Sequence, residues 1–248
     1  MLIKQRIKEL SLILAKDVSV VDVRIGLGYT AVLLDNGHVG VAYTFHRDVA
    51  GGCSVFKGLR PLAGKQASEL IAMLNSMDKV ESAVALAASN ALTNTVKEGF
   101  FEGDILEYMK LRPDDNVGMV GYFAPLVPAL RKKILSLKIF EQVDRGIGDL
   151  LPEKDVYRLL PRCQVALITS TSILNNTIDD ILTSAQSCRE VVLLGASTPL
   201  IPEAFIDTAV TILSGVLVIA PEEIMRIVSE GGGMRFFKNH IKKVNVRV

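Results

Sequence analysis

Hydroxyl, amide and glycine residues follow three hydrophobic runs in the second half of the chain. The runs cover residues 117–120, 165–168 and 191–194, and their β-branched composition is typical of parallel strands buried on both faces. Ligands of open parallel sheets bind beyond the carboxyl ends of the strands. We therefore predict one shared ligand site, although ordinary turn chemistry is the alternative at any single junction. The predicted ligand-binding residues at these junctions are Gly118, Gly121, Tyr122, Thr169, Ser170, Thr171, Ser197 and Thr198.

Asn175, Asn176 and Thr177 stand just before a predicted helix whose first turn contains Asp179 and Asp180. An Asn or Thr side chain there could cap the free backbone amides, and the acidic residues suit the helix dipole. Capping alone accounts for Asn175 or Thr177, but not easily for so many polar side chains around one strand end. We therefore expect all three residues to contact the ligand.

Gly118 and Gly121 lie between a predicted strand and a predicted helix, which is the context of a phosphate-binding turn. The full G-x-G-x-x-G pattern is missing, so phosphate or nucleotide binding is the less favoured hypothesis. Glu141 ends the next predicted strand, where an acidic residue would bind a ribose hydroxyl in a dinucleotide-binding fold. An exposed carboxylate without a role is an equal alternative, and an NAD enzyme is not favoured.

Two asparagines, Asn90 and Asn94, share one face of a predicted helix rich in Ala and Ser. Asn is a poor helix former, so its presence there needs a reason. A hydrogen bond across a domain interface and a ligand contact in an interdomain cleft are equal alternatives for Asn90. Thr44, at the end of a predicted strand, has the same two alternatives.

The residue types needed for catalysis or metal binding form no clear constellation. The histidines at 38, 46 and 240 show no triad order and no pairing with a cysteine. His46, Asp48 and Cys53 offer nitrogen, oxygen and sulfur ligands, but zinc sites have tighter paired spacings, so a loop with incidental polar residues is favoured. The sequence predicts no metal ligands on the protein, and it leaves the catalytic residues and the cofactor unidentified.

Composition excludes several classes of partner. The formal net charge of +1 gives no basic field for nucleic acid, and no apolar run approaches the roughly 20 residues of a membrane span. The first residues predict a charged amphipathic helix rather than a signal peptide. Three widely spaced cysteines favour reduced thiols, so we predict a cytoplasmic protein without membrane or nucleic-acid partners. The choice between a monomer and a homo-oligomer stays open.

The hydrophobic periodicity divides the chain into two predicted domains and gives an α/β fold class overall. Residues 1–111 predict a helix, three strands with a hairpin turn at Asn36-Gly37, and two helices, which form an α+β domain. In residues 112–248 strands and helices alternate, so βαβ units and a mainly parallel sheet are expected. The predicted strands of this second domain lie near 117–120, 137–141, 165–169, 191–194, 210–213 and 216–219, and its helices near 125–136, 153–160, 175–187 and 221–230.

This order of motifs resembles the putative heavy-metal chelation family. The resemblance rests on residues 117–123, 167–177 and 194–199, and on the Gly-rich stretch 231–233. It implies an N-terminal domain like the one that precedes the enolase barrel, followed by a Rossmann-like domain. It also implies a ligand cleft between the two domains, made for a metallophore, flavin-like or pterin-like molecule. Ser170 and Asn176 stand where the family more often has glycine, which restricts the backbone there.

The functional hypothesis is an enzyme of unidentified reaction that acts on a small, polar or heteroaromatic, metal-chelating compound. In this hypothesis Glu141 orients the compound or serves as a base, and any metal is carried by the bound compound. The alternative is a non-catalytic protein that binds a metallophore or a metal-charged ligand. The expected interdomain cleft favours the enzyme, whereas the missing acid–base constellation favours the binding protein.

Overall fold

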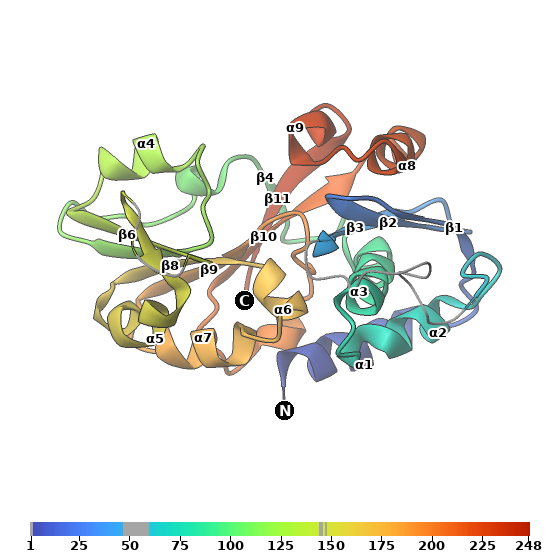
Figure 1. Ribbon diagram of the computed structural model, residues 1–248, viewed down its shortest axis with the longest axis horizontal. Coiled ribbons are helices and arrows are strands. Elements are labelled where there is room, and N and C mark those ends of the chain that lie inside the picture. The colour runs from blue at the N-terminus through green and yellow to red at the C-terminus, as the bar shows by residue number, and fades with distance from the viewer. Residues whose placement is uncertain (1, 47–59, 144–145, 147) are drawn as a thin grey trace.

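The computed structural model describes residues 2–46, 60–143, 146 and 148–248. Two sheets organise these residues, one small and antiparallel, the other large and mainly parallel (Figure 1). The fold is therefore a mixed α/β fold with a mainly parallel sheet in its second part, as the sequence predicts. Every helix of the described ranges is too short or too polar to cross a bilayer.

The small sheet has the strand order β1-β2-β3 and is fully antiparallel. It packs against α3, whose Ala-rich sequence allows a very close approach to β3. A Cβ atom at Gly40 would lie 2.1 Å from the backbone oxygen of Ala87, so any larger residue would force the helix away. The elements of this unit are α1 (Ile3–Leu14), β1 (Val20–Ile25), β2 (Tyr29–Leu34), β3 (Val39–Tyr43), α2 (Ala67–Ile71) and α3 (Lys79–Thr93).

The large sheet has eight strands in the order β4-β11-β10-β9-β8-β5-β6-β7. All neighbours from β10 to β7 pair in parallel, whereas β11 is antiparallel to both β10 and β4. The strands are β4 (Phe101–Glu102), β5 (Asn116–Val120), β6 (Ser136–Glu141), β7 (Leu150–Pro152), β8 (Val165–Thr169), β9 (Glu190–Leu194), β10 (Ile212–Val218) and β11 (Ile241–Arg247).

Both faces of the large sheet are covered, which explains the continuous hydrophobic runs of its strands. On one face Val120, Ala166 and Leu193 join a core shared with α5, α7 and the small-sheet unit. On the other face Met119 and Leu167 pack with α4 and residues 105–111. The helices of this part are α4 (Val127–Arg131), α5 (Val156–Leu159), α6 (Thr171–Leu174), α7 (Ile178–Ser184), α8 (Pro221–Ser229) and α9 (Met234–Phe237).

Several predicted element bounds are wrong. The two short strands expected near 210–219 are the single strand β10, and β11 was missed because charged residues interrupt its apolar pattern. The helix expected over 175–187 is the shorter α7 (Ile178–Ser184), because Asn176, with a φ of 64°, cannot belong to a right-handed helix. Strand β4 precedes residue 111 but pairs with β11, so the large sheet draws on both predicted domains. The domain boundary between residues 111 and 112 stays a prediction.

Candidate functional site

A cavity of about 270 Å³ lies at the carboxyl ends of β5, β6 and β8, and we call it the strand-end cavity. These three strands are neighbours and run in parallel, so their ends meet at one edge of the sheet. Six of the predicted ligand-binding residues line the cavity. They are Gly121, Tyr122, Glu141, Thr169, Thr171 and Asn175.

Glu141 holds the turn that follows β5. Its Oε1 accepts a hydrogen bond of 2.7 Å from the backbone nitrogen of Tyr122, and its Oε2 accepts one of 3.1 Å from the backbone nitrogen of Gln142. Gly121, with a φ of 88°, makes this turn possible, since a Cβ there would lie 3.0 Å from Cβ of Thr169. The carboxylate therefore fixes the turn that borders the cavity.

Thr169, Thr171 and Asn175 form the polar wall of the strand-end cavity. The hydroxyl oxygens of Thr169 and Thr171 lie 2.9 Å apart in a hydrogen bond. Oδ1 of Asn175 accepts hydrogen bonds from the hydroxyl of Thr177 at 2.7 Å and from its backbone nitrogen at 3.3 Å. Within the described ranges, Nδ2 of Asn175 has no hydrogen-bond partner, so its two N–H donors are unused there.

Side-chain capping, the alternative considered for Asn175 or Thr177, does not occur at the start of α7. Thr177 occupies the N-cap position of α7, but its side chain forms no hydrogen bond with the helix amides. Instead its hydroxyl donates to Asn175, so the pair closes the short link between α6 and α7. Asn176 points elsewhere and lines a different cavity, between α7 and α1. Thr177 thus supports the site through Asn175, and Asn176 lies outside it.

Tyr43 and Glu153 also line the strand-end cavity, and sequence reasoning missed both. Tyr43 ends β3, and its backbone nitrogen donates to Oγ of Ser197 at 2.8 Å, which joins the small sheet to the loop after β9. Glu153 follows β7, a strand that the hydrophobic pattern does not reveal. The neighbouring Thr44 was predicted, so the strand end itself was the available signal for Tyr43.

Ser170, Ser197, Thr198 and Asn90 are buried in packed structure and do not line the strand-end cavity, so a ligand contact by any of them stays a prediction. Nδ2 of Asn90 donates to the backbone oxygens of Val41 at 2.9 Å and Ser197 at 3.2 Å. The Asn90 side chain therefore forms a hydrogen bond across the interface, which was one of its two alternatives, and it links α3 to the loop after β9. The oxygens Oγ of Ser170, Oγ1 of Thr198 and Oδ1 of Asn90 have no hydrogen-bond partner in the described structure.

Gly118 and Thr44 also lie away from the strand-end cavity. Gly118 is inside β5, and a Cβ there would lie 2.4 Å from Cδ1 of Leu160. It is thus a packing glycine beneath Leu160 and Cys163, inside a strand, so the less favoured hypothesis of a phosphate-binding turn gains no support at Gly118. Thr44 is buried, its hydroxyl bonds to the hydroxyl of Thr30 at 2.9 Å, and it borders a separate apolar hollow beside His46.

The described residues contain no group of three His, Cys, Asp or Glu side chains that could hold a metal ion. Burial raises the pKa of the Cys163 thiol, and burial together with the charge of Cys163 raises the pKa of Cys188 to about 12. Neither thiol is therefore a ready thiolate ligand. His46, Asp48 and Cys53 were considered as possible metal ligands, and the last two lie outside the described residues.

Known proteins and family models match this chain over nearly its whole length. A family model described as “Putative heavy-metal chelation” matches residues 104–247, and a second model with the same description matches residues 7–93. An uncharacterized protein of Methanocaldococcus jannaschii is 28% identical over 99% of this chain and 96% of its own length.

Two solved structures share the fold. A Pyrococcus horikoshii protein of unknown function from the DUF364 family superimposes with a TM-score of 0.87 and 25% identity, and all of both chains is covered. A Desulfitobacterium hafniense protein of unknown function from the same family gives a TM-score of 0.82 at 23% identity, over 98% of this chain and 99% of that one.

Proposed function

Because this chain belongs to the family described as “Putative heavy-metal chelation”, we propose that its strand-end cavity binds a small polar compound that chelates a metal. Ligand pockets commonly enclose about 300–1,000 Å³. The volume of about 270 Å³ lies just below that range, so it favours a compact ligand. Among the compounds considered, a pterin-like or flavin-like ring system suits the cavity better than a long metallophore.

The observation that carries this proposal is the convergence of unlike polar groups at one edge of the sheet. Thr169 and Thr171 offer hydroxyls, and Asn175 offers a free amide nitrogen. Tyr43 closes the cavity from the small sheet. Polar groups placed in this way fix the orientation of a ring with several heteroatoms. Because the described residues provide no metal-binding trio, we assign the metal ligands to the bound compound.

Isothermal titration calorimetry with riboflavin and with pterin, each with and without Ni²⁺, tests the proposal. We expect the native protein to bind the compound. In Thr169→Val the affinity should fall about tenfold, since one hydrogen bond between uncharged groups contributes about 0.5–1.5 kcal/mol. Thr183→Val is the matched control, because Thr183 lies on α7 and its hydroxyl bonds to the backbone of Asp179. Equal affinities in both variants, or binding of Ni²⁺ alone without any compound, would contradict the proposal.

An enzymatic role has one specific observation in its favour, the carboxylate of Glu153. It lines the strand-end cavity and, within the described ranges, forms no hydrogen bond or ion pair. Glu141, by contrast, is engaged with two backbone amides. Glu153 is therefore the better candidate for a general base. Conversion of a bound compound that Glu153→Gln abolishes while binding persists would support the enzyme over the binding protein.

A further inference from the structure

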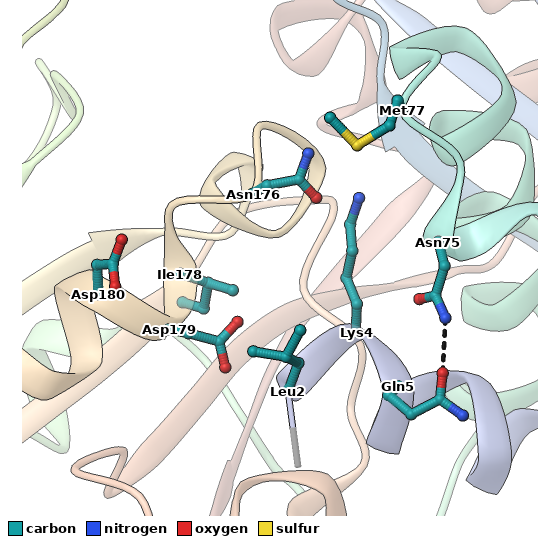
Figure 2. A pocket seen from close by; sticks show the side chains of 9 residues that line it. All are labelled: Leu2, Lys4, Gln5, Asn75, Met77, Asn176, Ile178, Asp179 and Asp180. Atoms are coloured by element: carbon teal, nitrogen blue, oxygen red, sulfur yellow. Dashed lines mark hydrogen bonds between the residues drawn. The ribbon is translucent and has the colours of Figure 1, made fainter.

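A second cavity, of about 600 Å³, lies where α1, the segment between α2 and α3, and the start of α7 meet (Figure 2). We call it the Lys4 cavity. Lys4 enters it from α1, Asn75 and Met77 from the segment before α3, and Asn176 and Asp179 from the region of α7. In Figure 2 the Lys4 side chain extends between Asn75 and Asn176, with its amine toward Met77.

Among the described residues, the buried amine of Lys4 has no ion-pair partner. The residue is 7% exposed, and Nζ donates one hydrogen bond of 2.9 Å to the hydroxyl of Ser82. That hydroxyl donates onward to the backbone oxygen of Leu74 at 2.9 Å, so its orientation is fixed. In the described part of the chain Lys4 forms no ion pair. Buried lysines are normally paired, so a lysine beside a cavity that forms no ion pair with the described residues is a candidate functional group.

We propose that Lys4 is a nucleophile that captures a small aldehyde or ketone in the Lys4 cavity as an imine. The nitrogen lone pair of the neutral amine attacks the carbonyl carbon, and a C–N bond forms as the carbonyl π pair moves to oxygen. A proton passes from nitrogen to that oxygen. The carbinolamine then loses its hydroxyl group and the second nitrogen proton as water, which leaves a C=N bond. The step needs no oxidant or reductant, and hydrolysis reverses it.

The charges around the cavity favour a neutral carbonyl compound over an anion. Lys4 is the single cation among the lining residues that the structure describes, whereas Asp179 and Asp180 contribute two carboxylates. One oxygen of Asp179 is already engaged, because it accepts a 3.0 Å hydrogen bond from the backbone nitrogen of Ile3. An anionic ligand would therefore meet net negative charge, which a neutral aldehyde or ketone avoids.

The state of the amine agrees with this geometry. Burial lowers the pKa of Lys4 to about 8. At pH 7 about one molecule in ten then carries the neutral amine, compared with about one in 3,000 for an exposed lysine of ordinary pKa. Desolvation of this kind is one of the ways in which proteins activate a lysine as a nucleophile.

Reductive labelling of the native protein with propionaldehyde and sodium cyanoborohydride tests the inference. Peptide mass spectrometry follows the alkylation of Lys4 and of Lys8, which lies one turn further along α1 and serves as the internal reference. At pH 7 we expect Lys4 to react at least tenfold faster than Lys8, with a rate that saturates as propionaldehyde rises. Its pH–rate profile should have a midpoint near 8.

Equal or slower labelling of Lys4 would overturn the inference, and so would a rate that stays linear in propionaldehyde. The same experiment on Thr169→Val keeps this test separate from the proposed function, because Thr169 lines the strand-end cavity and not the Lys4 cavity. Labelling of Lys4 should be unchanged in that variant.

Discussion

Replacing Lys4 with methionine should stabilise the protein at neutral pH. The folded state lowers the pKa of Lys4 from 10.5 to about 8, so holding the buried ammonium costs about 3 kcal/mol at pH 7, at about 1.4 kcal/mol per pKa unit. Methionine has a similar length and carries no charge. It loses the hydrogen bond to Ser82, worth about 1 kcal/mol, but the Ser82 hydroxyl still donates to Leu74. The expected net gain is about 2 kcal/mol.

The pH dependence identifies the cause of this gain. Between pH 8 and 10.5 the unfolded state holds a proton on Lys4 that the folded state has released, so the free energy of unfolding of the native protein rises with pH. Methionine does not titrate, and its advantage should therefore disappear by about pH 10.5. Below pH 8 Lys4 is protonated in both the folded and the unfolded state, so the gain in free energy of unfolding of the Lys4→Met variant should be constant.

Urea unfolding followed by far-UV circular dichroism at pH 7, 8, 9 and 10.5 measures both quantities. Lys8→Met is the matched control on the same helix, because the Lys8 amine lies at the surface and donates to the backbone oxygen of Ala72. A Lys4→Met variant whose difference from native protein is the same at all four pH values would refute the argument that burial of the charge is the cause.

Three further predictions concern other parts of the chain. Gly121→Ala should lower the free energy of unfolding by about 1–3 kcal/mol, measured by urea unfolding, since its φ of 88° suits few side chains. Burial opposes ionisation of Asp115, but hydrogen bonds and charge from Arg189 and Arg112 hold its pKa below the usual range. Asp115→Asn should therefore cost about 2 kcal/mol at pH 7, and this loss should vanish in acid titrations as the pH falls below about 4; a constant loss would contradict it. Asn94→Ala should lower the free energy of unfolding, measured by urea unfolding, by about 2–4 kcal/mol. The reason is that the Asn94 side chain forms hydrogen bonds with three backbone groups, including the nitrogen of Leu200 at 2.8 Å. A loss below about 1 kcal/mol would show that these three bonds do not contribute as expected.

The position of the strand-end cavity could be predicted from sequence because parallel strands align their carboxyl ends. The runs before Gly121 and Thr169 gave two of those ends, and the run before Glu141 gave a third. The same reasoning failed after β9, where Gly195 has a φ of 130° and turns the chain toward α3. Ser197 then contacts the small sheet, through the backbone nitrogen of Tyr43, instead of lining the cavity. No local sequence pattern predicts that change of direction.

The roles of the polar residues were harder to predict than their places. Glu141 was expected to face a ligand, but its bonds to backbone amides depend on the turn geometry around Gly121. The two alternatives for Asn90 could be separated only by knowing that α3 lies directly on Gly40. Lys4 carried no signal at all, because a lysine in an amphipathic helix is usually exposed, and its burial comes from the packing of α3 and α7 around α1.

The asparagine bonds between α3 and the loop after β9 act as a fixed joint between the two sheets. Asn90 and Asn94 together contact backbone groups of Val41, Ser197, Thr198 and Leu200, and all of these bonds are shielded from water. Parting the sheets would break them at once. We therefore expect a compound to enter the strand-end cavity without any movement of one sheet relative to the other. Its association rate should then follow diffusion and loss of hydration water, with no slow closure step.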